Sequence, residues 1–491
     1  MKQEYIIDKI ADESNCSTVI IGKDASVTGK VILGHNEDDP NAVVQLHVVP
    51  RVKHKEGETI SFADGSAVIP QVEETYSYYW SEVRCKGGIS FADGFVNEWG
   101  VAVVSNACRP SKIKEGDDSG IGYALRRLIA ERARTAREGV EVAAGLVEKF
   151  GYFSSRTYSI VDKNEAWVFQ VPTGRNYVAR KVGDDEIFYI PNWFTIHQVD
   201  FSDTEHKKFY FSKDLAKFAD ENGWYTPKVA GDYSDFDFAA AYQAGETAEY
   251  NILRARNAWR ILTGVKPEND LLKPFSKKAE RKYSADDIKK VLRSHYEGTE
   301  DDQTENYTRN PHRVGVCTLC NDTTIESSII EFNEDIYLTR LLRASQKPCI
   351  TPYTPWYPVA LTKIPDGYSA MGYLPAQVSH FYVDDSELEY DPAKAWWAFR
   401  TLQYFTEFNY RDTHGVLSQE VRAMEKDWES EKIGIEKAYT ELKETNLSAA
   451  REYLTSYTAT QAKKSWSWAN KMIHKLGEEK ILSNCKEWEN K

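Results

Sequence analysis

The sequence lacks several features that define large classes of protein. It has no apolar run of about 18 residues, the length that a membrane-spanning helix needs. It has no Gly-x-Gly-x-x-Gly or Walker loop, so we expect no nucleotide. Positive charge is scarce, because 62 Lys and Arg stand against 75 Asp and Glu, a formal net charge of −13. Nucleic-acid and membrane partners are therefore not expected, whereas a homo-oligomer stays open.

Cysteine is also scarce, and its count is odd. Seven cysteines in 491 residues, with acids where a secretory peptide needs a basic start, predict reduced thiols and a cytoplasmic location. Cys317 and Cys320 form one Cys-x-x-Cys, but no second pair and no His at zinc-finger spacing follow. We expect a structural role for them, a helical position for His295, and no metal or cofactor.

The first clear pattern after the polar segment 1–15 is a β-hairpin. Strand-like residues at 17–22 and 30–34 flank a turn-like stretch. If the turn is centred near Ser26, the numbers of paired residues sum to about 52, and cross-strand Cβ atoms lie about 5 Å apart. The hairpin therefore predicts that Cys16 lies beside the segment 35–38.

Further strands and helices follow in blocks. Helices beside antiparallel sheets predict an α+β fold. From about residue 392 the pattern is helical, and we expect these helices to pack on the core. The predicted segments are 88–95 with 101–105 (hairpin), 122–134 and 136–150 (helices, the second with a capping-box signature at Thr135 and Glu138), 157–162, 166–171, 176–182 and 187–190 (a meander), 284–296 (helix) and 325–332 (strand).

Cys16 is a candidate nucleophile if a base lies beside it. The nearest base available to any residue is its own α-amine, with a free pKa of about 7.7–8.0. This arrangement requires cleavage of the Asn15–Cys16 bond, and the segment 1–15, which lacks a core pattern, is compatible with removal. Free cysteine is more often a small buried hydrophobe, so residue type by itself does not select Cys16.

A family resemblance does select it. The run Cys16-Ser-Thr, then Gly22-Lys-Asp-Ala-Ser, then Gly34-His-Asn-Glu-Asp38 resembles the opening of the C69 family of cysteine dipeptidases, which reads Cys-Thr-Thr, Gly-Lys-x-Ala-Ser and Ala-Arg-x-Glu-Asp at the same spacing. The likeness extends to about residue 400 through 120–122, 136–140, 167, 178–182, 191–192, 250–254, 287–296 and 324–328.

The resemblance implies a four-layer αββα fold of the N-terminal-nucleophile hydrolases, hydrolysis of short peptides and no metal. It divides the chain into a propeptide (1–15), a catalytic domain (16–391) and a helical C-terminal region (392–491) packed on the core. Related enzymes leave two alternatives open. One is an amidase that cleaves N-acyl amides of the penicillin V or bile-salt type, and the other is a secernin-like protein that binds partners without catalysis.

The resemblance also implies roles for individual residues, at the positions where this sequence has the same residue as the family. Asp38 resembles the acid that holds the α-amine, with a turn residue as the alternative. Asn192 resembles an amide that donates to the oxyanion, with a turn-capping role equally compatible with the sequence. Asn106 follows the strand 101–105, where relatives place another oxyanion contact, and its register is uncertain by one residue.

Two further positions carry an open choice. Arg254 resembles a cation of the site, but Arg256 and Arg260 stand close by in the sequence. His35 replaces the arginine that usually precedes the acidic pair, and an imidazole cannot hold a carboxylate as a guanidinium fork does. Substrate preference is therefore open. His35 either tunes Cys16 or points away from it, and we favour the second.

Overall fold

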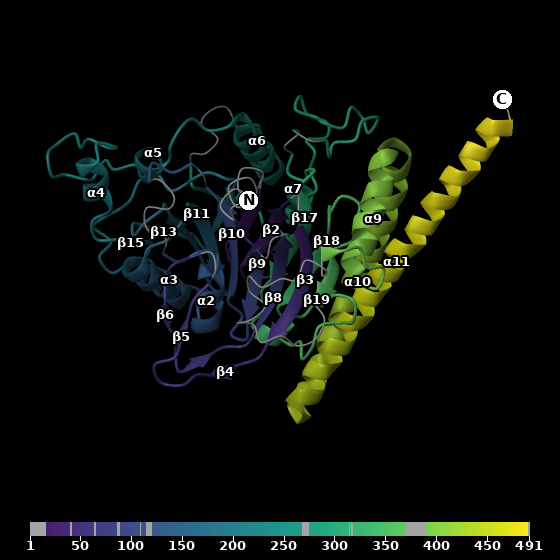
Figure 1. Ribbon diagram of the computed structural model, residues 1–491, viewed down its shortest axis with the longest axis horizontal. Helices are drawn as coiled ribbons and strands as arrows, with labels where there is room; N and C mark the ends of the chain where they lie inside the picture. Colours follow the sequence, from purple (N-terminus) through teal and green to yellow (C-terminus); the bar gives the residue numbers. More distant parts are fainter. Residues whose placement is uncertain are drawn as a thin grey trace.

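The computed structural model of the protein describes most of the chain (Figure 1). Residues 1–15 and Cys317 lie outside the described part, and residues 89–93 and 480–489 are described by their backbone only. Among the described residues, no helix is both long enough and apolar enough to cross a bilayer. The described ranges are 16–39, 42–62, 65–85, 89–108, 110–113, 120–267, 274–313, 315, 318–369 and 388–489.

Two antiparallel sheets form the centre of the described part. In spatial order, the seven-stranded sheet contains β16 (Ser276–Lys278), β14 (Glu186–Ile190), β1 (Ser17–Ile21), β2 (Ile32–Asp38), β17 (Thr324–Glu331), β18 (Arg340–Ser345) and β19 (Thr354–Trp356). The eight-stranded sheet contains β15 (Phe209–Phe211), β13 (Val178–Val182), β12 (Ala166–Val171), β11 (Arg156–Val161), β10 (Ala102–Ala107), β9 (Ile89–Asn97), β8 (Tyr78–Cys85) and β3 (Ala42–Val49).

Short ribbons and helices complete the described fold. The ribbons pair β4 (Val52–Lys53) with β7 (Glu74–Thr75) and β5 (Thr59–Ile60) with β6 (Ile69–Pro70). The helices are α2 (Leu125–Arg132), α3 (Ala136–Phe150), α4 (Leu215–Glu221), α5 (Phe238–Tyr242), α6 (Glu249–Thr263), α7 (Ala285–Leu292), the 3-10 turn η1 (Ile336–Leu338), α9 (Ala395–Phe408), α10 (Tyr410–Thr445) and α11 (Leu447–Glu489).

Alternating side chains along the strands build three apolar layers. Ile20 and Leu33 of one sheet belong to the same buried cluster as Val104 of the other, so this cluster lies between the sheets. On the outer face of the eight-stranded sheet, residues such as Val103 pack with α2 and α3. On the outer face of the seven-stranded sheet, residues such as Val19 pack with α6 and α7. The predicted αββα sandwich is confirmed.

The predicted hairpin at the start of the chain is also confirmed. β1 and β2 pair antiparallel, with Ser17 opposite Asn36 and Thr18 opposite His35. These numbers sum to 53, one more than the turn position suggested. Cys16 directly precedes β1, so it reaches the end of β2 near Glu37, as predicted.

The predicted meander is wrong in its last strand. Strands β11, β12 and β13 do pair in sequence, but β13 continues to β15, whereas β14 joins the other sheet beside β1. Phe188 packs between the two sheets, and Tyr189 packs under the outer helices. Because β14 is apolar on both faces, it suits a strand that is covered on both sides. This crossover brings the segment after Ile190 next to Cys16.

The predicted helix pair is present, with shorter bounds for the first helix and a partial capping box for the second. The Thr135 hydroxyl accepts from the backbone N–H of Glu138 at 3.1 Å, as an N-cap should. The Glu138 carboxylate accepts from the N–H of Arg134 at 2.7 Å. Gly151 ends α3 with a φ of 77°.

The helix predicted at 284–296 ends earlier. α7 begins at a capping box of Ser284 and Asp287 and stops at Leu292, and Tyr296 has a φ of 71°, which no helix residue adopts. The expectation that His295 is helical is therefore wrong. The five cysteines whose side chains are described are free in the structure, namely Cys16, Cys85, Cys108, Cys320 and Cys349.

The C-terminal part is helical, as predicted. In Figure 1, α10 and α11 run beside each other along one edge of the molecule, next to β18 and β19. Trp396 of α9, Leu417 of α10 and Trp468 of α11 belong to the cluster between the sheets. The division of the chain at residues 15 and 391 stays a prediction.

One close approach positions the strand that carries the candidate site. A Cβ on Gly34 of β2 would lie well inside van der Waals contact with Cγ2 of Ile288 in α7. Only glycine lets the helix pack this closely on the strand.

We therefore expect Gly34→Ala to lower the free energy of unfolding by about 1–3 kcal/mol, as an overpacked core does. Gly145→Ala is a matched control, because Gly145 is an exposed residue of α3 with open space around it. It should raise stability by up to about 1 kcal/mol through helix propensity. Denaturant unfolding measures both, and equal effects of the two substitutions would contradict the packing argument.

Candidate active site

Cys16 lies at the entrance of β1 and is 2% exposed. Its Sγ donates to Oε2 of Glu37 at 3.8 Å. Burial, with the nearby carboxyl groups of Glu37 and Asp38, raises the pKa of the Cys16 thiol well above its ordinary value, and a hydrogen bond from the Asp38 backbone only partly offsets this. In the chain with Asn15 attached, the sulfur therefore carries its proton at neutral pH.

A row of hydrogen bonds leads away from the sulfur. Oε2 of Glu37 lies 3.1 Å from Nε2 of His35, whose Nδ1 lies 2.8 Å from Oγ1 of Thr18. The Thr18 hydroxyl donates to Oδ1 of Asn106 at 2.6 Å, so it accepts from Nδ1 of His35, which must carry a hydrogen. A bond between Nε2 and Glu37 needs a second hydrogen. Cys16, Glu37, His35, Thr18 and Asn106 thus form one continuous row of hydrogen bonds.

The expectation that His35 points away from the site is therefore wrong. His35 and Glu37 are two residues apart on β2, so their side chains lie on the same face of the sheet. Both are buried at the same end as Cys16. The choice could not be made from the sequence, because the face depends on the exact register of the hairpin.

Arg254 connects Cys16 to two asparagines. From α6, its Nη1 donates to the Cys16 carbonyl oxygen at 3.0 Å, and its Nη2 donates to Oδ1 of Asn192 at 2.9 Å and of Asn251 at 2.6 Å. The neighbouring Arg256 and Arg260 form ion pairs with Asp301 and Glu300 instead. Of the three arginines, Arg254 is the one that contacts Cys16.

Asn192 and Asn106 are held in fixed orientations beside the cysteine. The Asn192 oxygen faces Arg254, so its Nδ2 lies on the other side and donates to the Ala107 carbonyl at 2.9 Å. The Asn106 oxygen accepts from Thr18, and its Nδ2 makes a long contact of 3.5 Å with the Ile190 carbonyl. Each amide nitrogen has a second hydrogen that a ligand could use.

Asp38 ends β2 opposite Thr324 of β17, and its side chain is fully buried. Oδ2 accepts from Nδ2 of Asn321 at 2.7 Å. Burial raises the pKa of Asp38 to about 8, although hydrogen bonds from Thr324 and Asn321 and the charge of Arg254 act in the opposite direction. A cation beside it would stabilise its charged form.

The structure thus brings all five predicted residues together, namely Cys16, Asp38, Asn106, Asn192 and Arg254. Sequence reasoning missed Glu37, Thr18 and Asn251 as members of the same network. All three stood in segments already singled out, the run 16–18, the hairpin end at 35–38 and the segment 250–254, but nothing in the sequence told which side chains point inward.

In two groups of described residues, the potential ligand atoms all lie within 4.8 Å of one another, which is close enough for them to hold a metal ion. One group is Cys16 with His35 and Glu37, where a bound metal would coordinate the sulfur of the candidate nucleophile. The other contains His295, His312, Cys320 and Cys349, and it is separate from the network around Cys16.

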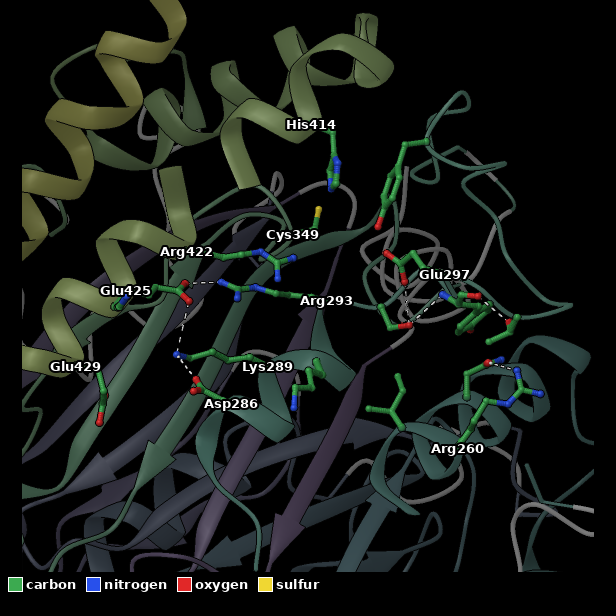
Figure 2. A pocket seen from close by; sticks show the side chains of 18 residues that line it. Arg260, Asp286, Lys289, Arg293, Glu297, Cys349, His414, Arg422, Glu425 and Glu429 are labelled. Atoms are coloured by element: carbon green, nitrogen blue, oxygen red, sulfur yellow. Dashed lines mark hydrogen bonds and ion pairs between the residues drawn. The ribbon is translucent and has the colours of Figure 1, made fainter. Parts of the chain in front are cut away.

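A cavity of about 650 Å³ is lined by residues of α6, α7 and α10 and of the loop after α7 (Figure 2). Charged side chains line it, among them Lys289, Arg293 and Glu425. None of the five predicted residues is among the described residues of its wall. Cys349 does contribute to the wall, together with Glu297 and His414.

Comparison with known proteins agrees with the sequence resemblance. A probable dipeptidase of Latilactobacillus sakei is 28% identical over 318 residues, 60% of this chain and 63% of that protein, so the chain spans less than two-thirds of its length. A probable dipeptidase B of Streptococcus pyogenes serotype M1 is 24% identical over 95% of this chain and 93% of its own.

Among solved structures, penicillin V acylase from Agrobacterium tumefaciens is 13% identical, with 70% of this chain and 84% of that chain covered. The TM-score is 0.34, which is too low to support the fold assignment. That assignment is based on the packing of the two sheets and the helices that cover them. The model of peptidase family C69 matches residues 15–424, well over half of the chain. The predicted resemblance is therefore confirmed, and this chain belongs to peptidase family C69.

Proposed function

We propose that the protein is a cysteine dipeptidase, which hydrolyses the amide bond of short peptides with Cys16 as its N-terminal nucleophile. The observation that carries the proposal is the convergence of Asp38, Asn106, Asn192 and Arg254 on a cysteine at a strand start. Membership of a peptidase family and the dipeptidase names of the relatives support the same activity.

The nucleophile requires that residues 1–15 be removed. With Asn15 attached, burial keeps the Cys16 thiol protonated, and Glu37 and Asp38 disfavour a thiolate. Cleavage would create an α-amine on Cys16 itself, with an ordinary pKa of about 7.7–8.0, which could take the thiol proton. The family match begins at residue 15, which supports a boundary at this position.

Cleavage of the Asn15–Cys16 bond also needs a base, and the pair of Glu37 and His35 is suited to this step. Glu37 already accepts the S–H hydrogen bond at 3.8 Å, and His35 shares the proton at 3.1 Å. The thiol proton would pass to Glu37 as the sulfur attacks the Asn15 carbonyl, and it would then pass to the Cys16 nitrogen as the amide bond breaks. Water would hydrolyse the resulting thioester, which releases residues 1–15 and the free thiol.

In the mature enzyme, the Cys16 sulfur attacks the substrate carbonyl while its proton passes to the α-amine. Asp38 would hold the resulting ammonium, and N–H groups of Asn192 and Asn106 would stabilise the oxyanion. The ammonium then gives its proton to the leaving amine, and water cleaves the thioester to regenerate the thiol. Arg254 positions both the Cys16 backbone and Asn192 through its bonds to their oxygens.

Short peptides are the proposed substrates because the relatives carry dipeptidase names. A panel of dipeptides and N-acyl amides separates this proposal from an amidase of the penicillin V or bile-salt type. A protein that turns over neither class, yet functions equally well with serine at position 16, would be a partner-binding protein of the secernin kind.

Intact-mass analysis tests the nucleophile and the processing together. We expect the wild-type chain to begin at Cys16, whereas Cys16→Ala should retain residues 1–15 and lose at least about 1,000-fold in dipeptide turnover, since a covalent nucleophile has no substitute. Cys85→Ser is the matched control, because Cys85 is buried and free but donates to Asp39 instead. Retention of residues 1–15 in an active wild-type enzyme would refute the mechanism.

The role of Arg254 is separable from that of its neighbour. Arg254→Lys keeps the charge but cannot hold the Cys16 carbonyl and Asn192 at once, so kcat of the processed enzyme should fall about 100-fold. Arg256→Lys, whose partner is Asp301, should stay within about twofold of wild type. Similar losses in both variants would remove Arg254 from the site.

The buried acid predicts a pH dependence in the uncleaved Cys16→Ala protein. Unfolded Asp38 loses its proton near its ordinary pKa of about 4, whereas in the folded chain its pKa is about 8. The folded state thus binds the proton more tightly, and stability should fall by up to about 1.4 kcal/mol per pH unit as pH rises through this window.

The double variant Cys16→Ala with Asp38→Asn provides the reference for this measurement. Denaturant unfolding of the two proteins between about pH 5 and pH 7 should show the decline only where Asp38 is present. Parallel stability profiles of the two proteins would mean that Asp38 is already charged before cleavage.

A further inference from the structure

A second group of reactive side chains lies outside the network around Cys16. His295 follows α7, His312 and Cys320 belong to the loop that precedes β17, and Cys349 lies between β18 and β19. All four side chains are buried. Their spacing along the chain, with 16, 7 and 28 residues between successive members, matches no zinc-finger pattern, which is why the sequence did not disclose the group.

The distances within the group match a tetrahedral metal site. Nε2 of His312 lies 3.6 Å from Sγ of Cys320, 3.4 Å from Sγ of Cys349 and 2.9 Å from Nε2 of His295. Zn–N bonds of about 2.05 Å and Zn–S bonds of about 2.3 Å at tetrahedral angles place N and S about 3.6 Å apart and two N atoms about 3.3 Å apart. The two N–S distances match this geometry, the N–N distance is about 0.4 Å shorter, and all four ligand atoms lie within 4.8 Å of one another.

The far nitrogens of both imidazoles face carboxylates. Nδ1 of His295 lies 2.8 Å from Oε1 of Glu297, and Nδ1 of His312 lies 3.5 Å from Oε1 of Glu407 in α9. The hydrogen bond to Glu297 fixes the His295 tautomer that leaves Nε2 free to bind a metal, whereas the longer contact of His312 with Glu407 is at ion-pair distance. Metal-bound histidines almost always have such a carboxylate or carbonyl partner. In the neutral tautomers with hydrogen on Nδ1, the two Nε2 lone pairs would face each other across 2.9 Å, and a metal ion between them would remove this repulsion.

We propose that His295, His312, Cys320 and Cys349 bind one zinc ion in a closed, four-coordinate structural site. A site of two thiolates and two imidazoles binds zinc in preference to calcium or magnesium, which prefer oxygen ligands. Four protein ligands leave no open coordination position for catalysis. Cys349 also lines the cavity of Figure 2, which offers the ion a path from solvent.

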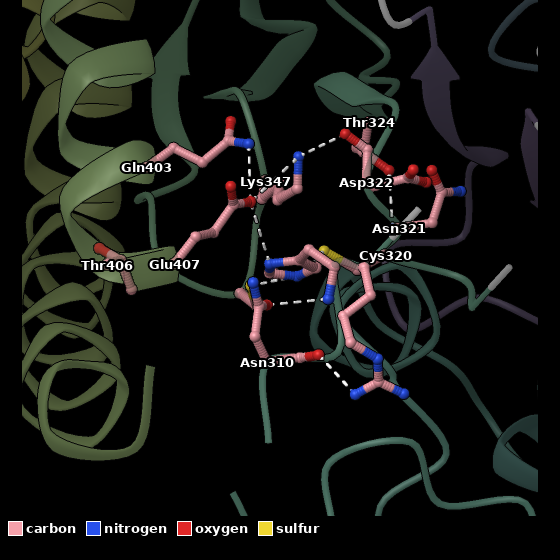
Figure 3. A network of polar contacts seen from close by, with 12 residues as sticks. Asn310, Cys320, Asn321, Asp322, Thr324, Lys347, Gln403, Thr406 and Glu407 are labelled. Atoms are coloured by element: carbon pink, nitrogen blue, oxygen red, sulfur yellow. Dashed lines mark hydrogen bonds and ion pairs between the residues drawn. The ribbon is translucent and has the colours of Figure 1, made fainter. Parts of the chain in front are cut away.

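The site would join three parts of the fold. Figure 3 shows Glu407 of α9 and Lys347 extending toward the loop that carries Cys320. Lys347 lies 3.7 Å from Glu407 and donates to the Asp322 carbonyl at 2.8 Å. The zinc would therefore fasten the segment after α7, the loop before β17 and the loop between β18 and β19 to one another, and Glu407 of α9 contacts this group through His312.

The same loops contact the strand that bears the candidate active site. Asn321, the residue after Cys320, donates to Asp38 at 2.7 Å. Asn36 of β2 donates to the Leu319 carbonyl at 2.7 Å and to the Leu292 carbonyl at 2.9 Å. Loss of the metal should thus disturb the end of β2 without removing any group that touches substrate.

The loops around the group contain several non-glycine residues with positive φ, an unfavourable backbone conformation that a bound metal would help to stabilise. Among the described non-glycine residues with φ between 49° and 71°, five lie in these loops and one elsewhere. Such conformations persist where surrounding contacts over-determine them. The five are Tyr296, Glu305, Asn306, Tyr307 and Gln346.

Metal analysis of the full-length protein, purified without chelator and exposed to equimolar zinc, tests the proposal. We expect about one zinc per chain in wild type and less than about a tenth of that in Cys320→Ser and Cys349→Ser. Cys85→Ser controls for loss of a buried thiol, and Cys16→Ala removes the other group of candidate ligands, so both should retain the ion.

Cobalt(II) exchange gives a readout that does not depend on the variants folding. The wild-type protein should show the intense visible bands of tetrahedral cobalt with thiolate ligands, and addition of zinc should abolish them. Three results would overturn the proposal: folded wild type without zinc or cobalt bands, zinc lost from Cys16→Ala instead, or a Cys320–Cys349 disulfide in peptide mapping of the freshly isolated protein.

Discussion

The arrangement of the candidate site depends on one buried cation. Arg254 has no exposed surface, and burying a charge is costly unless the charge is paired and hydrogen-bonded. Its partners are the carbonyl oxygen of Cys16, the side chains of Asn192 and Asn251, and the charge of Asp38 nearby. A helix, a strand start and the segment after β14 are therefore held in one geometry, because moving any of them would break a hydrogen bond to the buried guanidinium.

Strand β2 distributes the remaining groups by its pleat. His35 and Glu37 lie on one face and form the proton-sharing pair near the Cys16 sulfur. Asn36 lies on the other face and donates to carbonyl oxygens at the end of α7 and in the loop before β17. One short strand thus connects the network around Cys16 with the loops that hold the group of two histidines and two cysteines.

Local patterns explain what could be predicted. The hairpin of β1 and β2, the Thr135 cap and the strands β11 to β13 follow from alternation, turn residues and capping, which act between near neighbours in sequence. The position of β14 could not be predicted, because an apolar strand suits either covered sheet and only packing decides between them. The direction of His35 depended in the same way on a register that a shift of one residue would invert.

The sequence by itself determined the family and, through the family, the αββα layers, and it singled out Cys16 as the candidate nucleophile, since these rest on short-range patterns and on motifs that keep their spacing. Only the tertiary structure decided which arginine contacts Cys16, that His35 points inward, and that His295, His312, Cys320 and Cys349 meet. The physical reason is the same in each case. These contacts join residues that are far apart in the chain, and their geometry is set by how helices and loops pack on the sheets rather than by any local preference.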